Sequence, residues 1–159
     1  MSKQRVADVR EAYARDVTAA VHEARLHDAF AAVPREKFLG PGPWKIAEPR
    51  RGGYVTSASD DPSLVYVDAL IALDAAHGIN NGEPSAHAGW IAALDPKPGE
   101  RVLHIGAGTG YYTAILAELV GPAGKVVAYE SIAEQSKAGR ALARSSGASG
   151  PHSSTGGLR

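Results

Sequence analysis

The stretch that decides the fold of this 159-residue chain runs from Val102 to Glu130 and reads VLHIGAGTGYYTAILAELVGPAGKVVAYE. The apolar run Arg101–Ile105 predicts a short strand, and the apolar run Tyr111–Val120 predicts a helix. After the turn Gly121–Lys125, the run Val126–Tyr129 predicts a second strand. This order predicts a parallel pair with a right-handed crossover, and strands that are apolar throughout are typical of a sheet covered on both faces.

Between the first strand and the helix lies a glycine loop, Gly106–Gly110, with the sequence GAGTG. Glycine lacks a Cβ, so it permits both a sharp turn and a close approach of a ligand to the backbone. We expect N–H groups of the loop and of the helix start to face a polar ligand. Glu130, at the end of the second strand, is placed to accept hydrogen bonds from both hydroxyls of an adenosine ribose.

The spacing of the glycines bears on the kind of ligand. The dinucleotide fingerprint requires its third glycine where this chain has Tyr111. An adenosyl ligand without phosphates is therefore favoured over a nicotinamide dinucleotide. The alternatives are a dinucleotide-dependent oxidoreductase and a glycine turn that binds nothing.

An N-terminal helical arm is predicted before this unit. Apolar residues recur every three or four positions in one bent helix or two helices, and Pro34 ends the pattern. The stripe consists of Val6, Val9, Tyr13, Val17, Val21, Leu26, Phe30 and Val33. The connector Val33–Trp44 carries Phe38 and Trp44, which we expect to pin the arm to the body of the protein.

The middle of the chain is less regular. We predict a loop at Arg50–Gly53, a polar turn at Ser57–Asp61, and a short strand running into an apolar element within Leu64–Leu73. His77–Ser85 is expected to be a loop. Ala86–Leu94 is expected to be a helix with Trp90, Ile91 and Leu94 on one face.

Composition excludes several classes of protein. The chain has 17 Lys and Arg against 17 Asp and Glu, so nucleic acid is not an expected partner. It has no cysteine, which excludes a disulfide scaffold, a thiolate zinc site and a cysteine nucleophile. Its six histidines lack metal-ligand spacing, so no metal is expected. Neither a secretory signal nor a membrane-spanning run is visible, so a cytoplasmic location without membrane association is expected.

Three motifs together resemble one family. Val102–Glu130 resembles motif I and the following acidic strand of S-adenosylmethionine-dependent class I methyltransferases, most of all the protein-L-isoaspartate O-methyltransferase family. VPREKFLGP, at Val33–Pro41, resembles the Val-Pro-Arg-x-x-Phe signature of that family. NNGEPSAHAGWIAAL, at Asn80–Leu94, occupies the place of its Thr-x-Ser-x-Pro-x-x-His-Ala segment. The resemblance covers residues 5 to 130.

The resemblance implies an α/β fold, namely a partial Rossmann-like methyltransferase fold that holds the first β-α-β of a doubly wound sheet. It implies S-adenosyl-L-methionine as cofactor and a carboxylate of a protein or peptide as methyl acceptor. It assigns no catalytic residue. The residues that it implies for cofactor binding are His87, His104, Gly106, Ala107, Gly108, Thr109, Gly110 and Glu130.

Two of these residues have other readings, and the chain departs from the family in places. His104 stands where methyltransferases usually carry Asp or Glu, and the alternative is a strand residue bound to a backbone carbonyl. The alternative for His87 is an ordinary histidine near a helix start. Asn80 and Gly82 replace the family's Thr and active-site Ser, whose hydroxyls help to align the acceptor carboxylate. This replacement favours a changed substrate, or a remnant or cofactor-binding module without turnover.

The expected domain organisation follows from these motifs. We predict a helical arm and connector at 1–44, a partial cofactor-binding domain at 45–144, and a disordered Ser- and Gly-rich tail at 145–159. A weak helix is predicted at Ile132–Arg144. Since the resemblance ends near Ser131, a shifted reading frame or a truncated gene is expected there, and the open edge of Arg101–Ile105 is an aggregation hazard.

Overall fold

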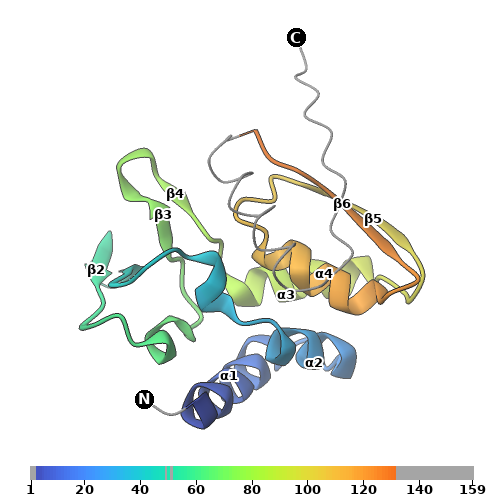
Figure 1. Ribbon diagram of the computed structural model, residues 1–159, viewed down its shortest axis with the longest axis horizontal. Coiled ribbons are helices and arrows are strands. Elements are labelled where there is room, and N and C mark those ends of the chain that lie inside the picture. Colours follow the sequence, from blue (N-terminus) through green and yellow to red (C-terminus); the bar gives the residue numbers. More distant parts are fainter. Residues whose placement is uncertain (1–2, 49, 51, 132–159) are drawn as a thin grey trace. The chain divides into compact units, whose positions relative to one another are not determined.

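The computed structural model of the chain describes residues 3–48, 50 and 52–131 (Figure 1). The predicted helix at Ile132–Arg144 and the predicted tail at 145–159 lie outside the described residues. The chain forms two compact units, Met1–Leu94 and Asp95–Arg159. The predicted domain boundary after Trp44 falls inside the first unit, and the predicted division into domains stays a prediction.

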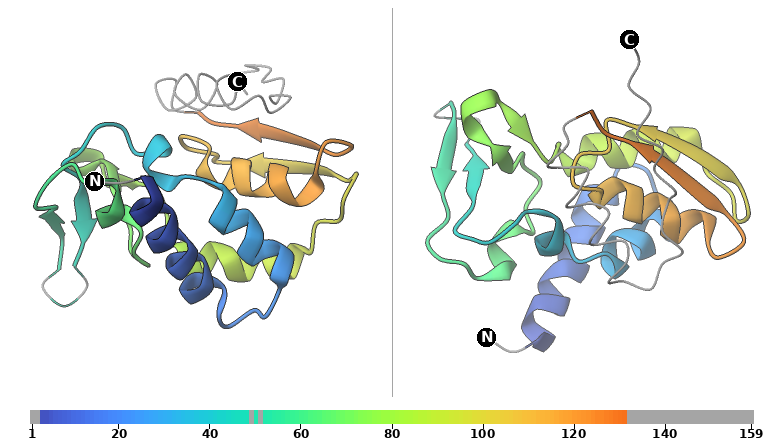
Figure 2. Two further views of the ribbon diagram at one scale, coloured as in Figure 1. Left: turned by 60° about the horizontal axis from the view of Figure 1, so that its bottom comes forward. Right: turned by 45° about the horizontal axis from the view of Figure 1, so that its top comes forward.

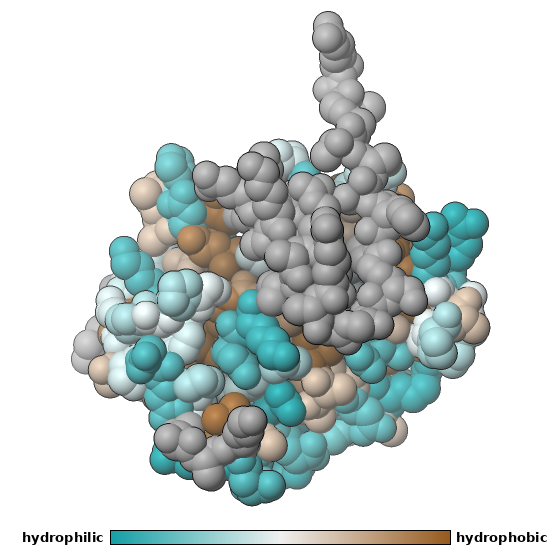
Figure 3. All heavy atoms as spheres, in the orientation of Figure 1, coloured by the Kyte–Doolittle hydropathy of each residue, from teal (hydrophilic) through white to brown (hydrophobic). Residues whose placement is uncertain are grey.

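The helical arm consists of two helices, α1 (Lys3–Thr18) and α2 (Ala24–Ala32), which pack against each other (Figure 1). The α2 helix ends at Ala32, one residue before the end of the predicted pattern at Val33, because the residue before a proline disfavours helical backbone. At its start a Glu23 carboxylate oxygen accepts the N–H of Leu26, 2.8 Å away. In Figure 3, polar side chains gather along the lower edge of the molecule over both helices. Because α1 and α2 are separate helices, the two-helix form of the arm is confirmed, and one bent helix is not.

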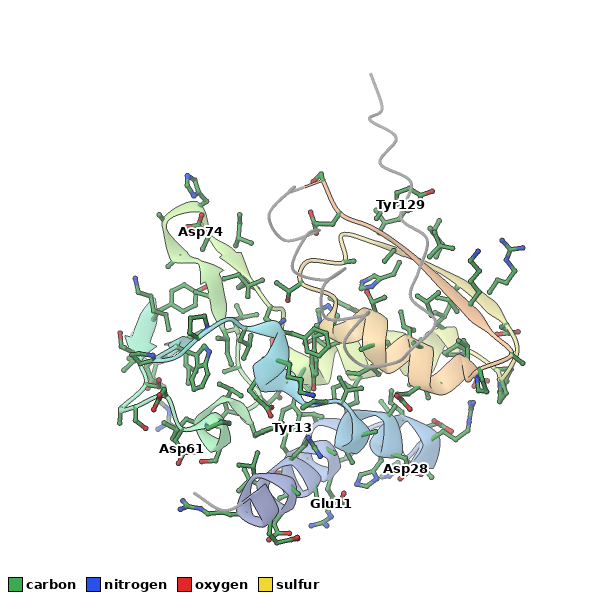
Figure 4. All side chains as sticks on the ribbon, in the orientation of Figure 1. Glu11, Tyr13, Asp28, Asp61, Asp74 and Tyr129 are labelled. Carbon is green, nitrogen blue, oxygen red and sulfur yellow. The ribbon has the colours of Figure 1, made fainter. Side chains whose placement is uncertain are left out.

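Aromatic side chains fill the core of the first unit. Tyr13, marked on α1 in Figure 4, packs edge-on against Phe30 of α2 with ring centroids 6.2 Å apart. It packs in the same way against Tyr66, with centroids 5.4 Å apart. All three rings are buried, as is Trp44 of the connector, whereas Phe38 is half-buried. The apolar stripe thus points inward as predicted.

Two short hairpins occupy the middle of the chain, where few strands were predicted. Strands β1 (Lys45–Ala47) and β2 (Tyr54–Thr56) pair antiparallel around the predicted loop. Strands β3 (Ala72–Asp74) and β4 (Ile79–Asn80) also pair antiparallel. Such two- and three-residue strands are too short to show a period of two in the sequence.

Three 3₁₀ turns link these elements: η1 (Arg35–Phe38), η2 (Pro62–Val65) and η3 (Ala75–His77). The strand predicted early in Leu64–Leu73 is wrong, because η2 ends there and irregular chain follows until β3. The backbone carbonyls of Val67 and Ala69 in that irregular chain accept hydrogen bonds from the buried side chain of Arg35.

The last element of the first unit is α3 (Pro84–Leu94), which packs against α1 and α2. It begins two residues before the predicted start, because proline is well tolerated in a first helical turn. The expected shared face is wrong. Ile91 is buried, but Trp90 and Leu94 are 66% and 58% exposed, and the buried positions are Pro84, Ala88 and Ile91.

The second unit contains the predicted strand–helix–strand, with β5 (Arg101–Ile105), α4 (Tyr111–Val120) and β6 (Lys125–Tyr129). The strands are parallel, with Arg101 opposite Lys125 and Ile105 opposite Tyr129. Figure 2 shows α4 along one face of this pair. The element order and the parallel pairing are therefore confirmed.

The prediction that both faces of these strands are covered is wrong for the described residues. Side chains alternate along a strand, so one set faces α4 and the other faces away. Leu103 and Ile105, in the second set, are 58% and 76% exposed. The reason is that α4 is the single helix packed on the pair within residues 95–131.

Candidate functional site

The glycine loop Gly106–Gly110 joins β5 to α4 at the carboxyl ends of the two parallel strands. The φ angles of Gly106, Gly108 and Gly110 are +75°, +56° and +95°, in the left-handed region that favours glycine. A Cβ built on Gly106 would meet no atom within 4 Å. The alternate glycines therefore serve the backbone path, and the surface at Gly106 is open.

The first two N–H groups of the loop are not available to a ligand in this conformation. Those of Gly106 and Ala107 donate to the carbonyl oxygen of Tyr129, at 2.9 and 3.0 Å. For Gly106 and Ala107 alone, this corrects the expectation that the loop N–H groups face a ligand. The carbonyl lies at the end of β6, where the loop folds over it and takes up its hydrogen-bonding capacity. The loop is consequently anchored to the strand that carries Glu130.

The Glu130 carboxylate lies against the same loop. Its Oε2 accepts the N–H of Gly108 at 2.6 Å, a short charge-assisted hydrogen bond. The hydroxyl of Ser131 lies 3.4 Å from the other carboxylate oxygen. An ionised carboxylate has about four lone-pair sites, so it can accept several donors at once. An acidic group fixed beside an open glycine loop is suited to a ligand that bears neighbouring hydroxyls.

His104 lies on β5 just before the loop and faces α4. Its Nδ1 is 2.8 Å from Oγ1 of Thr113, a buried residue in the first turns of that helix. A side-chain hydroxyl is thus one partner of this ring. The pair links strand and helix directly beneath the loop.

His87 belongs to α3 in the first unit, whereas the other predicted cofactor residues belong to the second. Its Nδ1 lies 2.9 Å from the carbonyl oxygen of Glu83, and its ring packs edge-on against Trp90, with centroids 5.0 Å apart. Burial lowers the pKa of His87 below its usual value, the Glu83 carbonyl opposes this, and the charge of Arg35 adds to the lowering. The neutral imidazole is therefore favoured.

The residues that replace the family's hydroxyls form a tight turn. Asn80 Oδ1 accepts the N–H of Gly82 at 2.9 Å, and Gly82 has a φ of +79°. A Cβ built on Gly82 would overlap Cε1 of His87. The imidazole thus occupies the space of a side chain at position 82, so a serine could stand there only if His87 moved.

The sequence indicates Asn81 as a polar residue that could replace the family's hydroxyls, but it assigns no role to Arg35 and Asp68, which also lie around this turn. Arg35 is fully buried and donates to the side chain of Asn81, and Asp68 accepts a backbone N–H in the first turn of α3. The signal for Arg35 was its place between Pro34 and Phe38, in a connector that was expected to pack. No comparable signal marks Asp68, whereas Asn81 lies in the segment Asn80–Leu94 that carries the resemblance.

Among residues 3–48, 50 and 52–131, no group of three or more His, Asp or Glu side chains could hold a metal ion. Within the same part of the chain, no helix has the length and apolarity that crossing a membrane requires.

The chain was compared with known proteins. The sequence model of the family described as Protein-L-isoaspartate(D-aspartate) O-methyltransferase (PCMT) matches residues 14–150, twenty residues beyond the expected end of the resemblance at 130. A protein-L-isoaspartate O-methyltransferase of Aeropyrum pernix is 36% identical over 114 residues, which are 72% of this chain and 36% of that protein. Protein-L-isoaspartate O-methyltransferase 2 of Archaeoglobus fulgidus is 37% identical over 123 residues, 77% of this chain and 47% of that protein.

Solved structures give the same picture of the fold. One described as a protein-L-isoaspartate O-methyltransferase superposes with a TM-score of 0.67 at 26% identity, over 87% of this chain and 39% of the other. A Plasmodium falciparum protein, in complex with S-adenosyl-L-homocysteine, superposes with a TM-score of 0.62 at 17% identity, over 86% of this chain and 55% of the other. The chain has a partial methyltransferase fold and spans 36% to 47% of the length of the two archaeal relatives.

Proposed function

Since this chain belongs to the protein-L-isoaspartate(D-aspartate) O-methyltransferase family, we propose that it binds S-adenosyl-L-methionine and transfers a methyl group to a carboxylate of a protein or peptide. The observation that carries the proposal is the anchored pair of glycine loop and acidic strand end. The loop presents an open surface at Gly106, and its Gly108 N–H fixes the Glu130 carboxylate beside it.

In this proposal the loop and the ends of β5 and β6 bind different parts of the cofactor. Gly106, Ala107, Gly108, Thr109 and Gly110 line its methionine portion, and Glu130 accepts hydrogen bonds from its ribose hydroxyls. His104 lies near its amino group, where the hydroxyl of Thr113 orients the ring. His87 is proposed as a further contact from α3.

Methyl transfer to a carboxylate requires little acid–base catalysis from the protein. When bound, S-adenosyl-L-methionine supplies an electrophilic methyl group on its sulfonium. A carboxylate is already ionised and nucleophilic at neutral pH, so the chain contributes orientation and proximity. A carboxylate oxygen gains the methyl group and the carbon–sulfur bond breaks, which yields a methyl ester and S-adenosyl-L-homocysteine. We therefore assign no catalytic acid or base, and the segment Asn80–Leu94 is proposed to face the acceptor.

The test is methyl transfer by the purified 159-residue chain. Cofactor labelled in its methyl group is incubated with an isoaspartyl peptide and, as a matched control, with the same peptide carrying normal aspartate. We expect base-labile label on the isoaspartyl peptide alone. Label on neither peptide, despite cofactor binding, would refute turnover.

A second candidate function is a cofactor-binding module without turnover. The observation that favours it is the turn at Gly82, where the imidazole of His87 fills the space of the missing hydroxyl side chain. It predicts saturable binding of S-adenosyl-L-homocysteine with no label transferred to either peptide.

A further inference from the structure

A buried guanidinium shapes the irregular chain before β3. Arg35 is fully buried, and its Nη1 donates to the carbonyl oxygens of Val65 and Val67, at 2.9 and 2.6 Å. Its Nη2 donates to the carbonyl oxygen of Ala69 at 2.9 Å. Three alternate carbonyls of one segment thus converge on one planar donor. Because the guanidinium is rigid, this arrangement fixes the path of residues 65–69.

The same guanidinium reaches the turn that precedes α3. Its Nε donates to Oδ1 of Asn81 at 3.3 Å. Asn81 is itself buried, and its backbone N–H donates to the carbonyl oxygen of Ile71 at 2.8 Å. Arg35 therefore connects residues 65–69 with the residue next to Gly82.

A second connection runs in the same direction through Asp68. This residue lies between Val67 and Ala69, whose carbonyls Arg35 holds. Its Oδ1 accepts the backbone N–H of Ser85, the second residue of α3, at 2.9 Å. A carboxylate in this place satisfies one of the N–H groups that a helix start leaves unpaired, and its charge complements the helix dipole.

We infer that Arg35 and Asp68 are positioning residues for the methyl acceptor, which hold Asn81–Ser85 in the conformation that binds it. Arg35 fixes the backbone on both sides of Asp68, and Asp68 fixes the start of α3. This inference rests on the proposed function, in which Asn80–Leu94 faces the acceptor. Of the proposed cofactor contacts only His87 lies in the same unit as Arg35 and Asp68, so their loss should weaken acceptor binding much more than cofactor binding.

The surface position of Asp68 makes it the better residue for a test. We would compare Asp68→Ala with Asp68→Asn, whose amide oxygen can accept the same Ser85 N–H, and with Asp16→Ala on α1 as a matched exposed control. Calorimetry with S-adenosyl-L-homocysteine and, separately, with an isoaspartyl peptide gives the two dissociation constants. Amide hydrogen exchange reports protection of the Ser85 N–H.

For Asp68→Ala we expect a rise in the peptide dissociation constant of about fivefold or more, with faster exchange at Ser85. Asp68→Asn should restore most of the affinity, and Asp16→Ala should change nothing. The inference is overturned by unchanged peptide affinity in Asp68→Ala, by an equal loss of cofactor affinity, or by a wild-type chain that binds no peptide. Cofactor binding is measured separately, so its absence would refute the proposed function while the peptide shift still supported the inference.

Discussion

Replacement of Glu130 by alanine is the change with the most direct expected effect on cofactor affinity. In the proposed complex its carboxylate accepts hydrogen bonds from the ribose. In the structure it also accepts the Gly108 N–H at 2.6 Å, which holds the loop in place. The substitution therefore removes a ligand contact and a loop anchor together, at a half-buried residue beyond the end of β6.

The size of the expected loss of cofactor affinity in Glu130→Ala follows from the charge of the Glu130 carboxylate. A hydrogen bond to an ionised group contributes about 1.5–3 kcal/mol, which corresponds to a loss of affinity of about tenfold to a hundredfold. Glu130→Gln keeps one acceptor oxygen but loses the charge, so its affinity should lie between those of Glu130→Ala and the wild type. Glu118→Gln, at an exposed position of α4, is the matched control and should bind as the wild type does.

The assay is calorimetric titration of each purified variant with S-adenosyl-L-homocysteine at one fixed salt concentration. Thermal melts would establish that the variants remain folded, because a lost transition would itself reduce binding. Wild-type affinity in both Glu130 variants would refute the assignment of this carboxylate to the ribose. An equal loss in Glu118→Gln would show that the effect belongs to surface charge instead.

Three further predictions concern the first unit. Gly82→Ala should lower the free energy of unfolding by about 1–3 kcal/mol in urea titrations, more than Gly78→Ala, since both have positive φ but only Gly82 faces an imidazole. The pKa of His87 is lowered from 6.5, so stability should decline as pH falls below about 6.5, and less steeply in His87→Gln. Arg35→Lys should lower the free energy of unfolding in urea titrations by about 2–4 kcal/mol, because an ammonium cannot donate to four acceptors in a plane. Arg25→Lys, at a partly exposed position, is the control for this substitution.

The second unit was predictable because its signals are local. Apolar runs on either side of a glycine loop determined the ends of β5 and α4, and both agree with the structure at the residue level. The parallel pairing followed from the handedness and spacing of such units. Exposure of Leu103 and Ile105 was not predictable in this way, since burial depends on what packs against a strand rather than on the strand itself.

The first unit was predictable only in its helices. Its hairpins have strands of two or three residues, and Val65–Val67 looked like a strand because apolar side chains dominate it. The backbone carbonyls of Val65, Val67 and Ala69 instead bind Arg35, which lies 30 to 34 residues earlier in the chain. A pattern among neighbouring residues therefore cannot predict these hydrogen bonds.

The candidate site, too, was predictable only where its contacts follow from local sequence. The glycines and Glu130 could be predicted as neighbours, because both lie at the carboxyl ends of adjacent parallel strands. The hydrogen bonds of Gly106 and Ala107 to Tyr129 could not be predicted, and they occupy two of the donors that the pattern assigned to a ligand. The imidazole of His87 likewise occupies the space that a Cβ at position 82 would need, which no local pattern in the sequence indicates.

Calorimetric titration of the 159-residue chain with S-adenosyl-L-homocysteine, in competition with a nicotinamide dinucleotide, tests most directly whether the glycine loop and Glu130 bind an adenosyl ligand without phosphates. We predict saturable binding at one site per chain, abolished or strongly weakened in Glu130→Ala and unaffected by an equal concentration of the dinucleotide. Absence of binding, or displacement by the dinucleotide, would contradict the assignment.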